Sequence, residues 1–295
     1  MKVGFIGLGA MGFHMAHNLR NARLLHLAYN RSAARAEEFR KETASPIAAS
    51  VEALARDCEL IVMCVGGDGD VLSLVARIAK EMPRGGIVID CSTVSRQTAV
   101  RAAAELGAYG IAFLDCPVSG GTEGARLGTL AIMAGGDRAS FERAQPVLAA
   151  MGKTVRWFGP AGSGQAAKAT NQIMCAGIIR AVAEAMAFAR AEGLPLETLV
   201  DTLGKGAGSS WYFVHRAPFM IKGEYPAGFR VRLHEKDLRI CRDMAAAHGA
   251  TLPVVEEVLA EYQALIREGY GDEDISALYR LKEPLFHDPG EDGTA

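Results

Sequence analysis

Short apolar runs alternate with amphipathic stretches along the first half of the chain. The runs with strand-like patterns are Val3–Ile6, His26–Tyr29, Leu60–Val65, Ile87–Asp90 and Phe113–Asp115. Ala-rich segments with helical periodicity separate them. This rhythm predicts an α/β fold with a Rossmann-type doubly wound parallel sheet. Two later runs, Thr129–Ala134 and Val155–Trp157, are expected to extend the sheet.

The rhythm changes after the Gly-rich segment at 159–165. From about Ser163 to Glu192 the chain continues without proline as an Ala- and Met-rich helix, and a glycine and a proline then stop it. At ~1.5 Å per residue this helix would span roughly 45 Å, and it is apolar on several faces. We expect it to be a spine that joins a domain over 1–162 to an all-helical domain over 163–295, which ends in a solvated tail at 287–295.

The composition argues against several classes of function. Lys and Arg number 32 against 34 Asp and Glu, so no overall charge draws the chain to nucleic acid or to an anionic membrane. The six cysteines lie far apart, and no His stands at zinc-ligand spacing, so we expect neither disulfides nor a metal site. The N-terminus is too Gly-rich for a signal peptide, and no run reaches ~18 apolar residues without a charge. These features favour a cytoplasmic protein that acts on a small molecule.

A glycine fingerprint, Gly7-Leu8-Gly9-Ala10-Met11-Gly12, follows the first predicted strand and opens a predicted helix. In this context Gly7 allows a tight turn, Gly9 lets the backbone approach a pyrophosphate, and Gly12 permits close helix–strand packing. The helix N-terminus adds free N–H groups and a positive dipole end. The alternative is a Gly-rich turn without a ligand, but a glycine inside a helix costs roughly 1 kcal/mol. We therefore expect a dinucleotide site.

The end of the second strand indicates which dinucleotide binds. There the sequence has Asn30, Arg31 and Ser32, with Arg35 one turn later, and no acid to accept from the ribose of NAD. Asn30 can hydrogen-bond the ribose, while Arg31 can bind a 2′-phosphate with Ser32 and Arg35 nearby. NADP is thus predicted, with NAD as the second option. The alternative is that both arginines are solvated surface charges of the next helix.

Four ordered blocks of sequence carry a resemblance to a known family. They are FIGLGAMGFHMAHNL (5–19), DCPVSGGTEGARLGTLAIMAGG (115–136), GSGQAAKATNQ (162–172) and KDL (236–238). With these blocks the chain resembles, over nearly its whole length, the beta-hydroxyacid dehydrogenases. These include 3-hydroxyisobutyrate dehydrogenase, tartronate semialdehyde reductase and the glyoxylate/succinic semialdehyde reductases. The resemblance implies hydride transfer between a nicotinamide and a small carboxylate substrate.

The second block looks like the substrate loop of that family. Ser119, Gly120 and Gly121 follow the strand that ends at Asp115, where open α/β sheets bind ligands. A hydroxyl and the N–H groups of two small residues form an anion nest suited to a carboxylate. An ordinary turn after Pro117 would fit the Gly-Gly pair equally well.

The third block carries the expected chemistry. Lys168 and Asn171 are three residues apart on the spine helix, so both side chains emerge on one face. In the family the corresponding Lys is the catalytic acid/base, and the Asn helps to hold substrate and Lys. A Lys shielded from water near a helix N-terminus has its ammonium disfavoured, which moves its pKa from about 10.4 toward working pH. The alternative is a solvated Lys at a helix start.

Further cofactor contacts follow from the resemblance. Val65, Gly66 and Thr93 match positions where the family contacts the nicotinamide half, and Lys236 matches a Lys that reaches the ligand site from the second domain. The alternative for Lys236 is a helix-surface Lys paired with the adjacent Asp.

Several features leave the substrate open. Trp211 could cap the pocket or belong to the core, and Arg230 and Arg232 could face a second substrate anion or solvent. Two alternative functions remain: an imine-type reductase of the same fold, which Lys168 argues against, and a non-catalytic NADP-binding protein. The apolar length of the spine predicts a homodimer or homotetramer, although core packing explains it as well.

Overall fold

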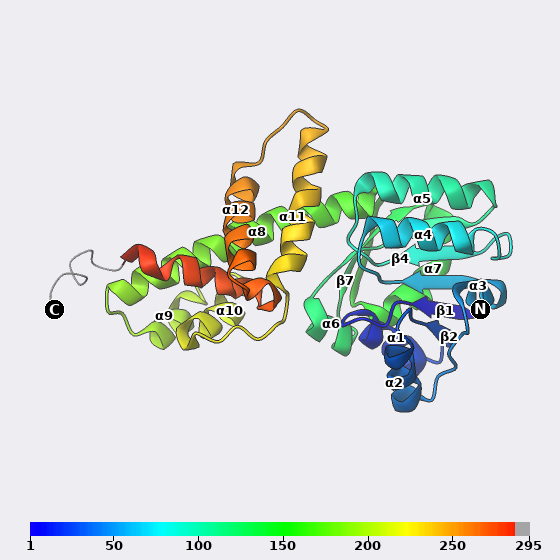
Figure 1. Ribbon diagram of the computed structural model, residues 1–295, viewed down its shortest axis with the longest axis horizontal. Coiled ribbons are helices and arrows are strands. Elements are labelled where there is room, and N and C mark those ends of the chain that lie inside the picture. The colour runs from blue at the N-terminus through cyan, green and yellow to red at the C-terminus, as the bar shows by residue number, and fades with distance from the viewer. Residues whose placement is uncertain (287–295) are drawn as a thin grey trace. The chain divides into compact units, whose positions relative to one another are not determined.

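The computed structural model describes residues 1–286 and divides the chain into two compact units, Met1–Lys168 and Ala169 onward. The first unit combines strands and helices, and the second is helical (Figure 1). The predicted fold class, a Rossmann-type sheet followed by an all-helical domain, is therefore confirmed. The tail expected at 287–295 lies outside the described residues.

Parallel strands form the body of the sheet in the order β2-β1-β3-β4-β5. Their bounds are β1 Val3–Ile6, β2 Leu25–Tyr29, β3 Leu60–Met63, β4 Ile87–Asp90 and β5 Ala112–Asp115. Each predicted run agrees with its strand to within one or two residues, the usual uncertainty of strand ends. The carboxyl ends of these strands thus lie along one edge, where open α/β sheets bind ligands.

Beyond β5 the sheet becomes mixed. Strand β7 (Ala131–Gly136) is antiparallel to β5 and to the short β6 (Val118–Ser119), while β8 (Thr154–Gly159) is parallel to β7. Because β5 and β6 pair with different parts of the same strand, β6 continues past the carboxyl end of β5. The segment with Ser119 is therefore held at that edge of the sheet.

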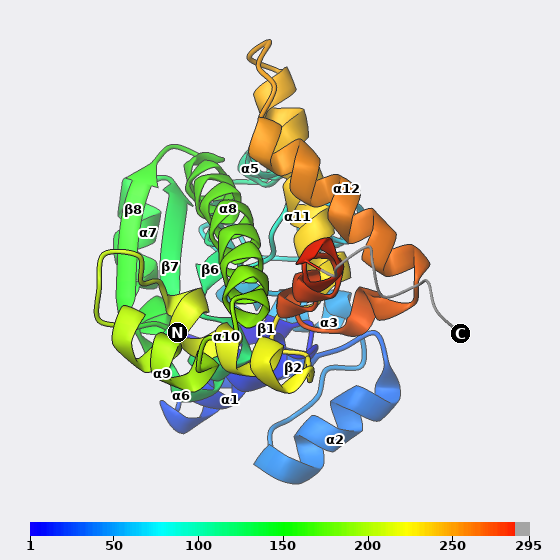
Figure 2. The same cartoon turned by 90° about the vertical axis from the view of Figure 1, so that its left-hand side faces the viewer.

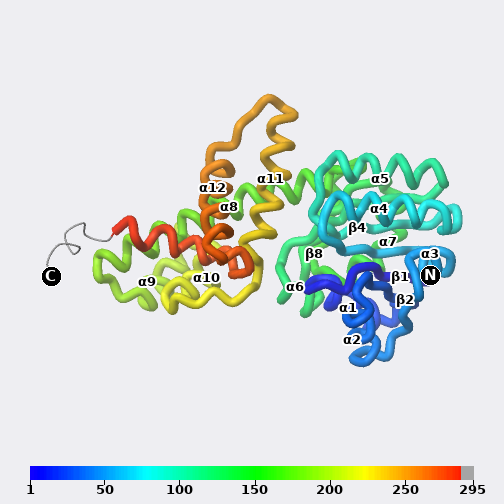
Figure 3. Tube along the Cα trace, in the orientation of Figure 1, coloured from blue at the N-terminus to red at the C-terminus, as the bar shows by residue number. Residues whose placement is uncertain are grey.

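Alternate residues of the strands face two separate cores. Phe5 and Val62 belong to one core and Ile6 and Ile61 to the other, as the two-residue period of a strand requires. Helices cover both cores, which makes the sheet doubly wound (Figure 3). These helices are α1 Gly12–Asn21, α2 Ala33–Thr43 and α7 Arg138–Met151 on the first core, and α3 Val51–Asp57, α4 Asp68–Ile78 and α5 Arg96–Ala108 on the second. A shorter helix, α6 (Gly121–Leu127), follows β6.

The spine helix α8 runs over Ser163–Ala191, close to its predicted extent (Figure 2). It begins in the first unit and continues into the second. The other helices of the second unit are α9 Leu196–Leu203, α10 Trp211–Lys222, α11 Val231–Ala246 and α12 Pro253–Arg267, followed by 3-10 turns at Tyr270–Asp272, Ile275–Leu281 and Glu283–Phe286. Apolar side chains of α8, α10, α11, α12 and the 3-10 turn at Ile275–Leu281 form the core of this unit.

The six cysteines, all within the described residues, form no disulfide. Cys91 and Cys116 directly follow β4 and β5, and burial among apolar side chains raises the pKa of both thiols well above its usual range. Burial likewise raises the pKa of the Cys58 thiol to about 12. These three thiols belong to the interior of the α/β unit.

Candidate active site

The fingerprint glycines turn the chain directly from β1 into α1. Gly7 has a φ of +98°, and a Cβ added there would lie 2.2 Å from the carbonyl oxygen of Cys64. A Cβ at Gly12 would lie 1.9 Å from the carbonyl oxygen of Gly7, so both positions require glycine. At Gly9, by contrast, an added Cβ would meet nothing within 4 Å. Helix α1 also has no side-chain cap, so the turn combines open space with an uncapped helix N-terminus, which fits a pyrophosphate.

Asn30 and Arg35 brace this glycine loop. Leu8 N donates to Asn30 Oδ1 at 2.8 Å, and Arg35 Nε donates to the carbonyl oxygen of Leu8 at 2.9 Å. The Arg35 guanidinium also lies 4.3 Å from the centre of the Phe13 ring. Arg31, by contrast, has 89% of its side chain exposed. Of the two arginines, Arg31 is therefore the more accessible to a 2′-phosphate.

The segments that follow β3 and β4 are tied together at the carboxyl edge of the sheet. Val65 N donates to Ser92 Oγ at 2.9 Å, and Thr93 is the next residue along. A Cβ at Gly66 would meet the Asp70 carboxylate at 2.7 Å, so the chain passes close to the first turn of α4. The structure thus brings the predicted contacts Val65 and Thr93 into neighbouring segments.

Lys168 reaches the loop that contains Ser119. Its Nζ donates to the carbonyl oxygen of Val118 at 2.9 Å, and only 7% of the residue is exposed. Gly120 and Gly121 follow Ser119 with φ angles of +129° and +61°, conformations that favour glycine. The interpretation of Lys168 as a solvated Lys at a helix start is therefore wrong. Two sequence blocks meet here although the bonded residues are 50 positions apart.

Asp115 anchors the helical turn that carries Lys168. Gly162 N donates to its Oδ1 at 2.8 Å, and Gln165 N donates to its Oδ2 at 2.9 Å. A Cβ at Gly164 would lie 2.4 Å from the carbonyl oxygen of Asp115, so this turn packs directly on the strand end. Burial outweighs these hydrogen bonds and raises the pKa of the Asp115 carboxyl. Sequence reasoning assigned no role to Asp115 or Gln165; the available signal was an acid at a strand end and an amide one turn before the Lys.

Asn171 and Lys236 have polar partners in the helical unit. Asn171 Nδ2 donates to Gln172 Oε1 at 2.9 Å and lies 3.4 Å from Cys175 Sγ. Lys236 Nζ lies 3.2 Å from Asp237 Oδ1, and Gln172 Nε2 donates to Asp237 Oδ2 at 2.7 Å. Gln172 therefore connects the two predicted residues within this unit.

Three further side chains of the helical unit were left open by the sequence. Trp211 is 52% exposed and stacks on His215 with ring centres 4.4 Å apart, so its interpretation as a core residue is wrong. Arg230 and Arg232 both pair with Asp272, at 3.2 and 2.6 Å. Each arginine thus already has a carboxylate partner in its own unit.

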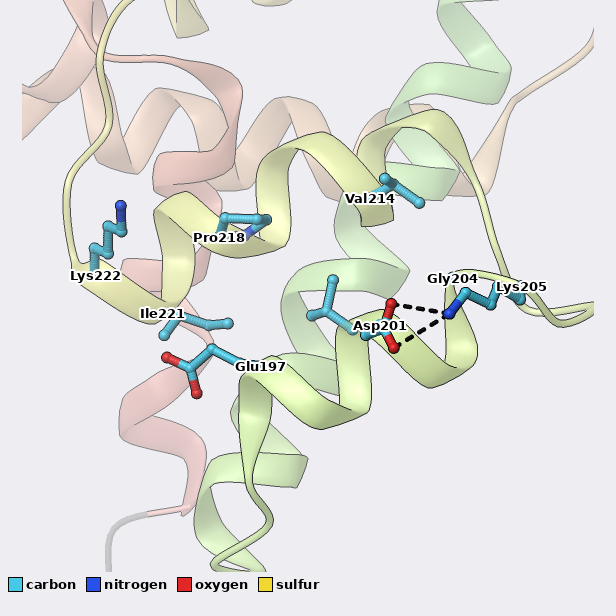
Figure 4. Close-up of a pocket in the computed structure, with 9 residues that line it drawn as sticks. Glu197, Asp201, Gly204, Lys205, Val214, Pro218, Ile221 and Lys222 are labelled. Atoms are coloured by element: carbon cyan, nitrogen blue, oxygen red, sulfur yellow. Dashed lines mark hydrogen bonds and ion pairs between the residues drawn. The ribbon is translucent and has the colours of Figure 1, made fainter.

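A cavity of about 480 Å³ lies between α9 and α10 of the helical unit (Figure 4). Its lining residues are Glu197, Val200, Asp201, Gly204, Lys205, Val214, Pro218, Ile221 and Lys222, none of them a predicted site residue. A smaller cavity of about 260 Å³ lies beside β2 and includes Asn30 and Arg31. Of these two cavities, the smaller one contains side chains expected to bind the cofactor.

Helix α8 is long and apolar enough to span a membrane by length and composition alone. However, Gln165 and Lys168 are buried with hydrogen-bond partners in the α/β unit. Further along, Ala176, Ile179 and Ala183 lie in the core of the helical unit. This packing favours a core helix, since the core helices of soluble proteins can be as long and as apolar as a membrane-spanning helix.

Comparisons with known proteins agree with this geometry. The family model for the NAD binding domain of 6-phosphogluconate dehydrogenase matches residues 2–159, and the model for NAD-binding of NADP-dependent 3-hydroxyisobutyrate dehydrogenase matches residues 162–282. The 2-hydroxy-3-oxopropionate reductase of Escherichia coli is 36% identical, with 96% of this chain and 97% of that protein covered. The NAD-dependent L-serine dehydrogenase of Pseudomonas aeruginosa is 32% identical, with 96% and 98% covered.

A solved structure extends the likeness to three dimensions. The Mycobacterium tuberculosis 3-hydroxyisobutyrate dehydrogenase with L-serine matches with a TM-score of 0.86 at 29% identity, covering 95% of this chain and 98% of that one. Together the two family models account for both the α/β part and the helical part of the chain. The chain therefore belongs to the beta-hydroxyacid dehydrogenase family and is an NAD(P)-dependent hydroxyacid dehydrogenase.

Proposed function

We propose that this dehydrogenase prefers NADP(H) and interconverts a small beta-hydroxyacid with its semialdehyde or oxo acid, with Lys168 as general acid/base. The observation that carries the proposal is the buried Lys168 Nζ, bonded to the carbonyl oxygen of Val118 directly beside Ser119. The named substrates of the relatives, 2-hydroxy-3-oxopropionate, L-serine and 3-hydroxyisobutyrate, all carry oxygen on the carbon beta to a carboxylate. A site with an anion nest and a nearby proton donor suits that pattern.

In the proposed mechanism, the Ser119 hydroxyl and the N–H groups of Gly120 and Gly121 bind the substrate carboxylate. During reduction, the Lys168 ammonium donates a proton to the carbonyl oxygen as the carbonyl carbon receives a hydride. During oxidation, the neutral amine accepts the hydroxyl proton as the hydride leaves. The bound nicotinamide supplies or accepts the hydride. Asn171 helps to hold substrate and Lys168.

The cofactor contacts follow the order of the sheet. The backbone from Gly7 to Gly12, including Leu8, Ala10 and Met11, would hold the pyrophosphate. Asn30, Arg31 and Ser32 would hold the ribose and its 2′-phosphate, while Arg35 braces the loop beneath them. The residues proposed for the nicotinamide half are Val65, Gly66, Thr93 and Lys236.

We also propose a cytoplasmic homodimer or homotetramer, with 1–162 binding the cofactor and 163–295 serving substrate binding and dimerisation. Met174 and Phe188 on α8 are 55% and 51% exposed, which leaves apolar area on this helix that a second subunit would cover. Light scattering after size-exclusion chromatography tests this, since a monomer at micromolar concentration would contradict it.

A substrate panel with both cofactors tests the proposed reaction. It contains glyoxylate and the semialdehydes of succinate, methylmalonate and tartronate, together with the corresponding hydroxyacids and L-serine. We expect NADPH-dependent reduction of at least one aldehyde acid, and NADP-dependent oxidation of its hydroxyacid. A cyclic imine is added as a further substrate, and its turnover without turnover of any aldehyde acid would favour an imine reductase. Tight NADPH binding without any turnover would favour a non-catalytic protein.

A further inference from the structure

We propose that Gln165 is a positioning residue whose carboxamide holds the Thr93 segment against the helical turn that bears Lys168. The inference rests on the proposed function, because it assumes that Lys168 moves the proton. It assigns a role to a side chain that lies in the α/β unit one turn before Lys168.

Both polar ends of the Gln165 side chain bind the backbone on either side of Thr93. Val94 N donates to Gln165 Oε1 at 3.2 Å, and Gln165 Nε2 donates to the carbonyl oxygen of Ser92 at 2.9 Å. Gln165 is 1% exposed and Ser92 and Val94 are 2% and 1% exposed. Without the carboxamide, the N–H of Val94 and the C=O of Ser92 would be buried without these partners, which lowers the stability of this backbone conformation. Gln165 thus fixes the backbone around Thr93.

The same helical turn is tied to the end of β5. Gln165 N donates to Asp115 Oδ2 at 2.9 Å, and Lys168 Nζ donates to the carbonyl oxygen of Val118 at 2.9 Å. Residues three apart on a helix share a face, so Gln165 and Lys168 project from the same side of α8. One turn of helix therefore links the segment after β4 to the segments after β5.

This link matters because a hydride and a proton must reach adjacent atoms of one carbonyl group. Thr93 is a proposed contact of the nicotinamide half, and Lys168 is the proposed proton donor. A displacement of about 1 Å between groups that must act together can cost on the order of 10²-fold in rate. Gln165 would therefore affect catalysis without touching substrate, cofactor or the transferred atoms.

The chemistry of the side chain explains why an amide is suited to this place. A carboxamide offers one acceptor and one donor group without charge. An ionised Glu would keep the acceptor for Val94 N but could not donate to Ser92. A Met has similar length and lacks both functions. Gln165→Glu thus removes one of the two hydrogen bonds and Gln165→Met removes both, while each keeps about the volume of the glutamine side chain.

The test compares Gln165→Met and Gln165→Glu with wild type and with Gln145→Met, a half-buried glutamine on α7, as the matched control. We expect Gln165→Met to lower kcat by about 10- to 100-fold, with the Kd for NADPH changed by less than about 3-fold. Gln145→Met should stay within about 2-fold in both quantities. If Gln165→Met does not fold, as judged by circular dichroism, Gln165→Glu serves in its place. A folded variant with wild-type kcat, or one that loses kcat and NADPH affinity equally, would overturn the proposal.

A double-mutant cycle separates positioning from a merely structural role. If Gln165 acts through Lys168, adding Gln165→Met to Lys168→Ala should lower kcat by no more than about 3-fold further. If the loss of kcat in the double variant equals the product of the losses in the two single variants, the two side chains act independently, which would contradict the inference. A Lys168→Ala protein with wild-type activity would instead refute the proposed function itself, and the two failures are thus distinguishable.

Discussion

Arg31 and Asp70 form an ion pair, with 3.3 Å between Nη1 of the arginine and Oδ1 of the aspartate. The arginine follows β2, and the aspartate lies in the first turn of α4. Their side chains are 89% and 41% exposed, and pairs in this environment contribute about 0–1 kcal/mol. A 2′-phosphate, with more charge and a geometry suited to the guanidinium, could displace the carboxylate at little cost.

This relationship predicts the cofactor response of Arg31→Asp. The substitution should raise the KM for NADPH by at least about 10-fold and that for NADH by much less, since charge-assisted bonds contribute about 1.5–3 kcal/mol. Steady-state kinetics with both cofactors measures this. As a control, Asp70→Asn should leave NADPH use intact or strengthen it slightly, because it removes the competing carboxylate. Equal affinity of the wild type for NADH and NADPH at physiological salt would contradict the role of Arg31.

The loop at Ser119 should act on substrate use alone. Ser119→Ala should lower kcat/KM by about 10-fold, because one hydrogen bond to a carboxylate is lost. Gly120→Val should lower kcat/KM further, since a β-branched side chain is strained at the φ of +129° that Gly120 adopts. Titration of NADPH by fluorescence should give near wild-type affinity in both variants. Loss of NADPH binding in the Ser119→Ala protein would place the loop at the cofactor instead.

Lys168 is expected to dominate the proton transfer. Lys168→Ala or Lys168→Met should lower kcat by about 10²–10⁴-fold, with NADPH affinity little changed. Some rate should persist, because water can supply the proton, and the rate should vary less with pH than in wild type. Reduction of the best substrate is to be followed from pH 6 to 10. A folded Lys168→Ala protein that works within a few-fold of wild type across this range would remove Lys168 from the mechanism.

The contact between Gln172 and Asp237 predicts a secondary effect on the cofactor. Asp237 accepts from Gln172 and pairs with Lys236, so Asp237→Asn should release Lys236 while it keeps the shape of the side chain. We expect the KM for NADPH to rise by about 3- to 10-fold, and Lys236→Met to give a similar rise. The double variant should be no worse than Lys236→Met alone. If the KM for NADPH in the double variant rises by the product of the two single rises, Asp237 does not act through Lys236.

Local patterns predicted the strands, the glycine turn and the spine helix. Gly7 and Gly12 could be assigned from spacing alone because the turn between a strand and a helix imposes the same backbone demands wherever it occurs. The predicted strand ends agree with the observed ends to within two residues, since buried parallel strands are marked by short apolar runs bounded by polar residues. These features depend on neighbours along the chain.

Contacts between distant segments could not be predicted from such patterns. Nothing in the spacing showed that Lys168 would bond to Val118, or that Gln165 would bind the backbone around Thr93. Arg35 illustrates the same limit: its charge suggests a phosphate ligand, whereas its side chain, in the first turn of α2, donates to the carbonyl oxygen of Leu8. Side-chain partners of this kind depend on how strands are ordered in the sheet.

Three buried cysteines make it possible to measure local opening of the α/β unit by thiol labelling. Since only the thiolate reacts quickly with disulfide reagents, thiols whose pKa burial has raised, Cys58, Cys91 and Cys116, should be inert in the folded protein at neutral pH. Cys91 and Cys116, which follow β4 and β5, would become reactive only when the carboxyl edge of the sheet opens, whereas Cys58 precedes β3 at the opposite edge. The rate at which Cys91 and Cys116 are labelled, read by mass spectrometry with and without NADPH and with Cys58 as the reference, would therefore report how far cofactor binding restrains the edge of the sheet at which the proposed site lies.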